Sequence, residues 1–173
     1  VLAYVPGTGA APDYSLVGVD RTGRATPISD QARGYEDLNL SPDGRRVALT
    51  IEEPGQDFSA AHVWLGDLVR GTLTRFTFEG YSRDPIWAPD GEYLPFAARA
   101  VGGDGLVICG PKRRKAVRRI RVNLSGLASP VFSPDGKQLA FTGMEGGISD
   151  LYVINADGTG LRQLTRDKYA QLM

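Results

Sequence analysis

Three short segments combine tyrosine with charged side chains and come just before stretches with strand-like patterns. They are Tyr35-Glu36-Asp37, Tyr81-Ser82-Arg83-Asp84 and Lys168-Tyr169. Tyrosine rings offer apolar contact area to a ligand, and arginine can bind a carboxylate or a backbone carbonyl. We predict that these segments bind a peptide or a protein tail through Tyr35, Glu36, Asp37, Tyr81, Arg83, Asp84 and Tyr169. The structural alternative is that Asp37 and Asp84 bond loop backbone while each tyrosine packs on a neighbouring element.

The sequence lacks the motifs of common hydrolytic and metal-dependent mechanisms. It has no G-x-S-x-G, G-x-x-x-x-G-K-[ST] or H-E-x-x-H. His62 is the single histidine and Cys109 the single cysteine, too few for a zinc site with several such ligands. His62 begins an apolar segment, where we expect a structural role. We therefore predict that the chain is not an enzyme, has no catalytic residue and needs no metal or cofactor.

A Pro-Asp-Gly motif recurs at nearly constant spacing. Pro42-Asp43-Gly44, Pro89-Asp90-Gly91 and Pro134-Asp135-Gly136 follow one another at intervals of 47 and 45 residues. Proline presets φ, aspartate bonds nearby backbone and glycine accepts a positive φ, so the motif predicts a tight turn between two strands. The three aspartates are therefore interpreted as turn formers and not as calcium ligands.

The residues around each motif predict one four-stranded antiparallel unit per repeat. A second strand follows the turn, as at Arg46–Leu49, then a third, as at Leu151–Ile154, and a further turn leads to a fourth. No segment has the apolar period of a helix. Aromatic residues at repeat-equivalent positions are predicted to pack between the units: Trp64, Trp87, Phe96, Phe132, Phe141 and Tyr152. Pro95 occupies a strand position where the other repeats have Ala48 and Ala140, which predicts a bulge or a locally unpaired strand.

This period suits one blade of a β-propeller, so we predict an all-β chain of about four four-stranded antiparallel blades. The predicted domain spans 1–173, with repeats at 1–34, 35–80, 81–126 and 127–168, and with 169–173 beginning a further strand able to pair with 1–5. Three architectures fit: a closed four-bladed ring, a homodimer that completes an eight-bladed ring, or part of a longer propeller. Four blades are the lower limit of known propellers, so we favour the last two. An open four-blade arc would expose strand edges and should therefore associate with a partner.

The charges predict neither a nucleic-acid partner nor membrane insertion. Twenty basic and 20 acidic side chains cancel, so no global field attracts a polyanion. No apolar run approaches the roughly 20 residues of a membrane helix. The basic segment from Lys112 to Arg121 is interpreted as a solvated turn and edge strand, with an acidic protein partner as the alternative.

The Pro-Asp-Gly turns, together with Asp67–Thr77 and Leu151–Thr165, resemble the WD40-like Pro-Asp repeats of TolB-type propellers over nearly the whole chain. Similar repeats occur in the propellers of prolyl oligopeptidase-type enzymes and of some bacterial serine/threonine kinases. The resemblance implies a bacterial β-propeller that binds a protein or peptide without catalysis. The alternatives are the gating propeller of a serine peptidase and the sensor propeller of a kinase. Both periplasm and cytoplasm stay open as the compartment.

Overall fold

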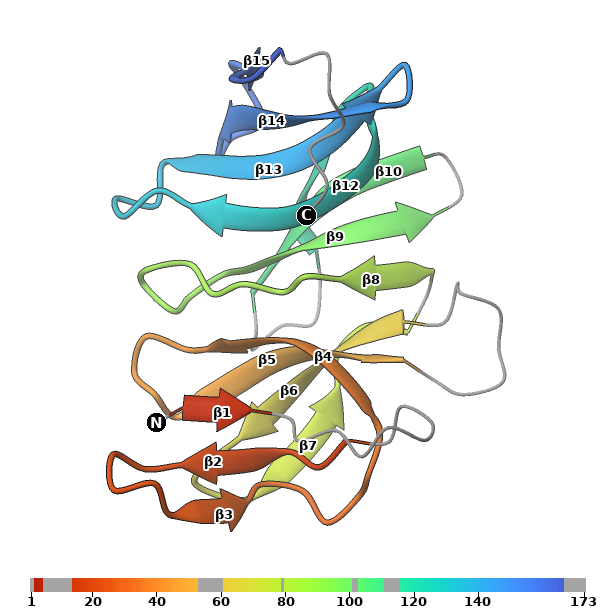
Figure 1. The fold of residues 1–173 in the computed structure, drawn as a ribbon. Helices are drawn as coiled ribbons and strands as arrows, with labels where there is room; N and C mark the ends of the chain where they lie inside the picture. The colour runs from red at the N-terminus through yellow and green to blue at the C-terminus, as the bar shows by residue number, and fades with distance from the viewer. Residues whose placement is uncertain are drawn as a thin grey trace. The chain divides into compact units, whose positions relative to one another are not determined.

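The computed structural model describes residues 2–4, 14–52, 61–78, 80–100, 103–110 and 116–166. The regular structure of these residues consists of strands in four antiparallel sheets (Figure 1), so the predicted all-β class is confirmed. No helix in the described part of the chain is long and apolar enough to cross a membrane. The chain divides into two compact units, Val1–Pro85 and Ile86–Met173, called here the first and second units.

The first unit holds two antiparallel sheets in which strands that follow one another in the chain are neighbours. One sheet has the order β1 (Leu2–Tyr4), β2 (Val17–Val19) and β3 (Ala25–Pro27). The other has the order β4 (Gly34–Leu40), β5 (Arg46–Glu52), β6 (Ala61–Asp67) and β7 (Thr72–Arg75), and β8 (Tyr81–Arg83) follows in the chain. Its core packs residues that are 0 to 2% exposed: Leu16, Tyr35, Val47, Leu49 and Ile51.

The second unit has the same antiparallel plan. The strands β9 (Leu94–Ala100), β10 (Gly103–Cys109) and β11 (Ala116–Arg121) lie side by side in that order. The next sheet has the order β12 (Ser125–Phe132), β13 (Gln138–Glu145), β14 (Ile148–Asn155) and β15 (Arg162–Gln163). Strand β11 lies at a sheet edge and exposes Arg118 and Arg119, whereas Lys112 to Lys115 lie outside the described residues.

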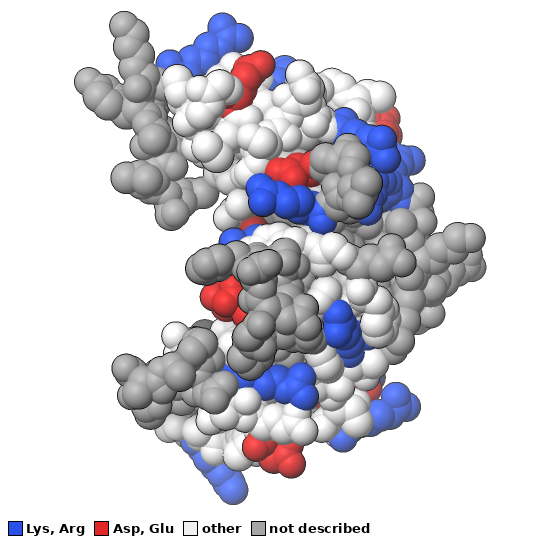
Figure 2. Space-filling model, turned by 90° about the vertical axis from the view of Figure 1, so that its right-hand side faces the viewer, with Lys and Arg blue, Asp and Glu red and all other residues white. Residues whose placement is uncertain are grey.

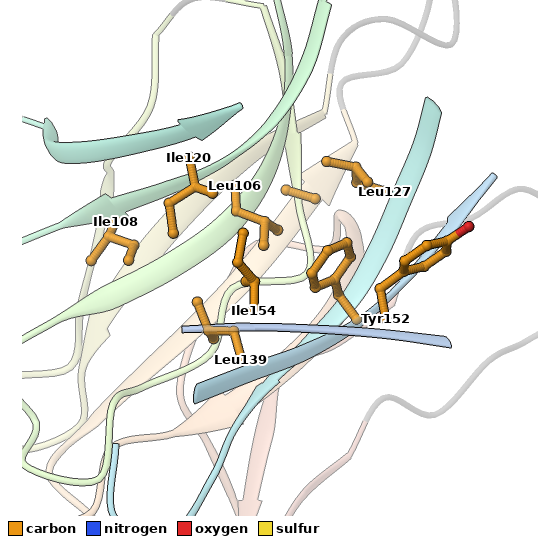
Figure 3. Packing of buried hydrophobic residues seen from close by; sticks show 9 residues of the cluster. Leu106, Ile108, Ile120, Leu127, Leu139, Tyr152 and Ile154 are labelled. Atoms are coloured by element: carbon orange, nitrogen blue, oxygen red, sulfur yellow. The ribbon is translucent and has the colours of Figure 1, made fainter. Parts of the chain in front are cut away.

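The core of the second unit forms between these two groups of strands (Figure 3). Leu106 of β10 and Leu139 of β13 are both fully buried, and the Phe141 and Tyr152 rings stack with centroids 6.0 Å apart. Four of the six predicted core aromatics are buried, but Trp64 and Phe132 are only half-buried. Burying apolar area at about 25 cal/mol per Å² makes these contacts the main stabilising term for the unit.

Each Pro-Asp-Gly motif lies in a turn closed by a backbone hydrogen bond. The amides of Gly44, Gly91 and Gly136 each donate to the carbonyl three residues earlier at 2.8 Å, and the three glycines have φ of 66°, 69° and 70°. The carboxylate of Asp43 accepts from the Ser41 hydroxyl at 2.6 Å and from the Arg45 amide at 3.1 Å. The hydroxyl bond lowers the pKa of Asp43, so this carboxylate already serves the turn as an ionised acceptor.

The irregularity predicted at Pro95 is absent from the pairing of β9 with β10. It lies on the other side of Pro95, where residues 84–88 form no strand. The register of β9 with β10 runs without a break from Ala100 to Leu94, with Pro95 opposite Ile108. The Pro95 carbonyl accepts from the Ile86 amide at 3.0 Å. Since the amide nitrogen and carbonyl of one strand residue point to the same neighbour, the missing donor of Pro95 faces Ile86 and leaves the ladder to β10 intact.

The need for glycine at the positive-φ position of the turn can be tested at Gly44. A Cβ added there would meet no atom within 4 Å, so Gly44→Ala tests only the cost of a positive φ for an L-residue. We expect the free energy of unfolding to fall by about 1 kcal/mol, measured by urea denaturation. Gly44→Asn should lose clearly less, because asparagine tolerates this conformation. Equal losses for both variants would contradict the backbone explanation.

Candidate functional site

Two of the predicted segments meet around one guanidinium in the first unit. Arg83 Nε lies 3.6 Å from Asp84 Oδ2 and 3.9 Å from Asp37 Oδ2, and Arg83 Nη2 lies 4.0 Å from Glu36 Oε2. We call Glu36, Asp37, Arg83 and Asp84 the Arg83 cluster. Three carboxylates surround one cation, so the cluster has an excess of negative charge.

An unusual backbone conformation places two of these carboxylates. Asp37 and Asp84 have φ of 51° and 53°, and Ser129, at the equivalent position of a later repeat, has φ of 49°. Each lies five residues before a turn proline. Aspartate enters this left-handed region more readily than most residues. The pairing of β4 with β5 shifts register between Glu36 and Asn39, which marks a bulge around Asp37.

Asp37 also holds the neighbouring chain segments together. Its Oδ2 accepts from the Thr50 hydroxyl on β5 at 2.9 Å and from the Asp84 amide at 3.2 Å. Asp37 therefore bonds loop backbone and faces Arg83 at the same time. Sequence motifs did not indicate Thr50 as part of this cluster. Aligning the predicted strands in register would have placed it opposite Glu36, where the β4–β5 pairing has it.

The cluster is open to solvent on its Glu36 and Arg83 side. The side chains of Glu36 and Arg83 are 39% and 37% exposed, against 23% for Asp37 and 11% for Asp84. Partial burial raises the pKa of Glu36, and the nearby Glu52 and Asp37 raise it further. Burial opposes the charge of Arg83, but Asp84, Tyr81, Asp37 and Glu36 outweigh it and raise its pKa. Arg83 is thus already matched by carboxylates, and the surplus charge of the cluster suits a cationic group.

The predicted tyrosines have different surroundings. Tyr81 is half-buried beside the cluster: its hydroxyl oxygen accepts from Arg83 Nη1 at 3.1 Å, and the Arg83 Cζ lies 5.9 Å from its ring centroid. Tyr35 is 2% exposed, and its hydroxyl donates to the Gln31 carbonyl at 2.8 Å, so it lies in the core. Tyr169 lies outside the described residues. The structure therefore brings together five of the seven residues: Glu36, Asp37, Tyr81, Arg83 and Asp84.

Other reactive groups are buried or dispersed. In the described part of the chain, no three His, Cys, Asp or Glu side chains are arranged to hold a metal ion. His62 is 7% exposed within β6. Burial raises the pKa of Cys109 to about 11, so its thiol stays protonated at neutral pH. On the face drawn in Figure 2, Lys and Arg occur in several small groups with Asp and Glu among them.

Sequence comparison finds two kinds of similar bacterial protein. No family model matches it. It is 38% identical over 85 residues to the Tol-Pal system protein TolB of Anaeromyxobacter dehalogenans strain 2CP-C, a match that covers 48% of this chain and 19% of that protein. It is 28% identical over 109 residues to the uncharacterized peptidase YuxL of Bacillus subtilis strain 168, covering 61% of this chain and 17% of that protein. The matches therefore span about a fifth of these relatives.

Structural comparison gives the same fold. The solved structure of TolB from Acinetobacter baumannii superposes with a TM-score of 0.78 at 20% sequence identity, covering 97% of this chain and 41% of that one. With four antiparallel sheets and this neighbour, the predicted β-propeller fold is confirmed.

The raised pKa of Glu36 predicts how pH affects stability. Folded Glu36 keeps its proton at pH values where the unfolded chain has lost it, so its contribution to stability falls as pH rises through the acid range. We expect Glu36→Gln to raise the melting temperature at neutral pH, with a difference that shrinks as the pH is lowered toward 4, the region of an ordinary glutamate.

Circular dichroism melts from neutral to acid pH measure this difference. Glu92→Gln is the matched control, because Glu92 is an exposed glutamate in a turn of the second unit. A Glu36→Gln variant that is less stable than the parent at neutral pH would show that the ion pair with Arg83 outweighs the burial of Glu36.

Proposed function

Because this chain is a TolB-like β-propeller, we propose that it is a non-catalytic module that binds a protein or peptide partner through the Arg83 cluster. The observation that carries the proposal is the surplus of carboxylates around Arg83. Two of these carboxylates belong to Asp37 and Asp84, which occupy equivalent repeat positions and both have a positive φ. Glu36 is half-exposed, so an incoming group can reach it.

The chemistry of the cluster points to a basic group on the partner. Ionised Glu36 is disfavoured by burial and by neighbouring carboxylates. A lysine, an arginine or a free N-terminal amine placed beside it would relieve that repulsion and form charge-assisted hydrogen bonds. The Tyr81 ring beside Arg83 adds apolar area for the stem of such a side chain. A protein partner also agrees with the likeness to a Tol-Pal system protein.

The likeness to YuxL supports a second candidate, in which the chain is part of the propeller of a serine peptidase. The nucleophile would then lie elsewhere in the full-length gene product, because the 173-residue sequence contains no G-x-S-x-G motif. Labelling the full-length gene product with a fluorophosphonate distinguishes the two candidates. Covalent labelling supports the peptidase, and absence of labelling in a folded product supports the binding module.

The Arg83 cluster is tested with a lysine-containing pentapeptide and the same peptide acetylated on every amine. Isothermal titration should show binding of the free peptide and about tenfold weaker binding of the acetylated one, or about 1.4 kcal/mol. Glu36→Gln should weaken binding by a similar factor although it stabilises the fold at neutral pH, so the loss cannot come from unfolding. Glu92→Gln should bind like the parent. Equal affinity for both peptides would rule out recognition of a cation by this cluster.

We also propose that the 173-residue polypeptide self-associates, because about four blades lie at the lower end of the four to eight in known propellers. Light scattering across a dilution series should give about twice the chain mass of 18.6 kDa. A mass equal to one chain at all concentrations would contradict the homodimer and leave the binding proposal unaffected.

A further inference from the structure

A pocket of about 720 Å³ lies within the second unit and shares no residue with the Arg83 cluster. Its walls come from three turns, at 88–90, 134–137 and 155–157, and from Tyr93, Ile108, Arg118 and Phe132. The volume falls within the range of about 300 to 1,000 Å³ typical of ligand sites. The interior is apolar, since Ile108 of β10 (labelled in Figure 3) is buried and Phe132 of β12 is half-buried.

Contacts between two successive repeats form the walls of this pocket. The Ala156 amide donates to the Lys137 carbonyl at 2.8 Å, and Arg118 Nη1 donates to the Ala156 carbonyl at 2.9 Å. A Cβ added to Gly136 would lie 3.7 Å from Pro89 Cδ, so two of the Pro-Asp-Gly turns lie side by side. A site whose walls are fixed in this way loses little entropy when a ligand binds.

Tyr93 exposes an aromatic ring at a position where the repeat does not need one. It is 41% exposed, and the equivalent positions of the other repeats hold Arg46 and Gln138. In all three repeats this residue makes the same backbone bond, because its carbonyl accepts from the residue before the turn proline at 2.9 Å. The turn therefore forms without an aromatic side chain, and the Tyr93 ring is available for binding.

The charged side chains of the lining lie at its rim. All five are exposed: Asp90, Arg118, Asp135, Lys137 and Asp157. Each of the three carboxylates accepts from the amide two residues later in its own turn, at 2.9 to 3.1 Å. Two cations share this rim with three carboxylates, so it gives no net attraction to an anion. We expect an occupant that is uncharged where it meets the pocket.

Two side chains of the lining have hydrogen-bond donors to offer. The Tyr93 hydroxyl makes no hydrogen bond to a described residue, and neither do Nε and Nη2 of Arg118. Aromatic rings beside available donors match a polyproline II segment. Such a segment presents flat apolar rings, and its backbone carbonyls have no internal hydrogen bonds.

We propose that this pocket binds a proline-rich segment of a partner protein in the polyproline II conformation. The proline rings of the segment pack on Tyr93, Phe132 and the two turn prolines. Its carbonyls accept hydrogen bonds from the Tyr93 hydroxyl and from Arg118. The segment is already extended in solution, so it loses little conformational entropy on binding. The site is independent of the Arg83 cluster and of what that cluster binds.

Nuclear magnetic resonance of the isoleucine-methyl-labelled chain tests the proposal. The probe is pentaproline with an N-acetyl and a C-terminal amide group, which carries no charge. Titration should shift the Ile108 signal, assigned with Ile108→Val, and leave the signal of Ile51 in the first-unit core in place.

The mirror-image peptide of D-proline is the matched control. It has the same composition and apolar surface but the opposite helical hand, so it should bind at least about tenfold more weakly. An Ile108 signal that stays fixed up to about 10 mM L-pentaproline overturns the proposal. Equal binding of the two peptides would also overturn it, because apolar contact alone does not distinguish the hand of the helix.

Variants of Tyr93 test the residue on which the site depends. Tyr93→Gln places there the side chain type found at the equivalent position 138, so the turn should fold while pentaproline binding weakens about tenfold. Tyr93→Phe keeps the ring and should lose only about threefold. Val69→Gln removes an apolar side chain that is 76% exposed in the first unit, and should bind like the parent. Parent-like affinity of a folded Tyr93→Gln variant contradicts the proposal.

Discussion

The carboxylate of Asp37 is the point at which two segments separated by 47 residues meet. Its Oδ2 accepts hydrogen bonds from both the Asp84 backbone amide and the Thr50 hydroxyl. These bonds fasten the residue after Arg83 to the β4–β5 pair and so help to keep Arg83 near Glu36. The arrangement depends on a positive φ at Asp37, which turns its side chain out of the regular alternation of β4.

The carboxylates of the Arg83 cluster differ in how well the fold stabilises their charge. Asp37 and Asp84 each face Arg83, and Asp37 also bonds backbone, so both have favourable partners within the fold. Glu36 is different, since burial and two nearby carboxylates raise its pKa. We predict that ionised Glu36 lowers stability at neutral pH. A residue of this kind at the open side of a cluster would suit the proposed binding function, because a bound cation would offset the unfavourable charge.

Repeat symmetry specifies the turns of this chain and also two aspartates of the proposed binding site, Asp37 and Asp84. The turn aspartates at 43 and 135 make the same bonds to a serine hydroxyl and to a backbone amide in both repeats. Other positions differ from one repeat to another. Ser129 replaces Asp37 and Asp84 at the positive-φ position, and Trp64, although predicted as core, is half-buried.

The sequence by itself determined the all-β class, the antiparallel order of the strands and the TolB-like propeller likeness. Proline, aspartate and glycine specify a turn through local backbone chemistry, so three copies at one period suffice to predict the repeat. It also indicated Glu36, Asp37, Arg83 and Asp84 as a candidate set, because they flank predicted strands.

Only the tertiary structure decided which residues share a site. It placed Tyr35 of β4 in the core and Tyr81 of β8 beside Arg83, although the two have similar sequence contexts. It also showed that the missing donor of Pro95 faces away from β10. These outcomes depend on strand register and on the direction of each side chain, which non-local hydrogen bonds and packing set and which residue types alone do not encode.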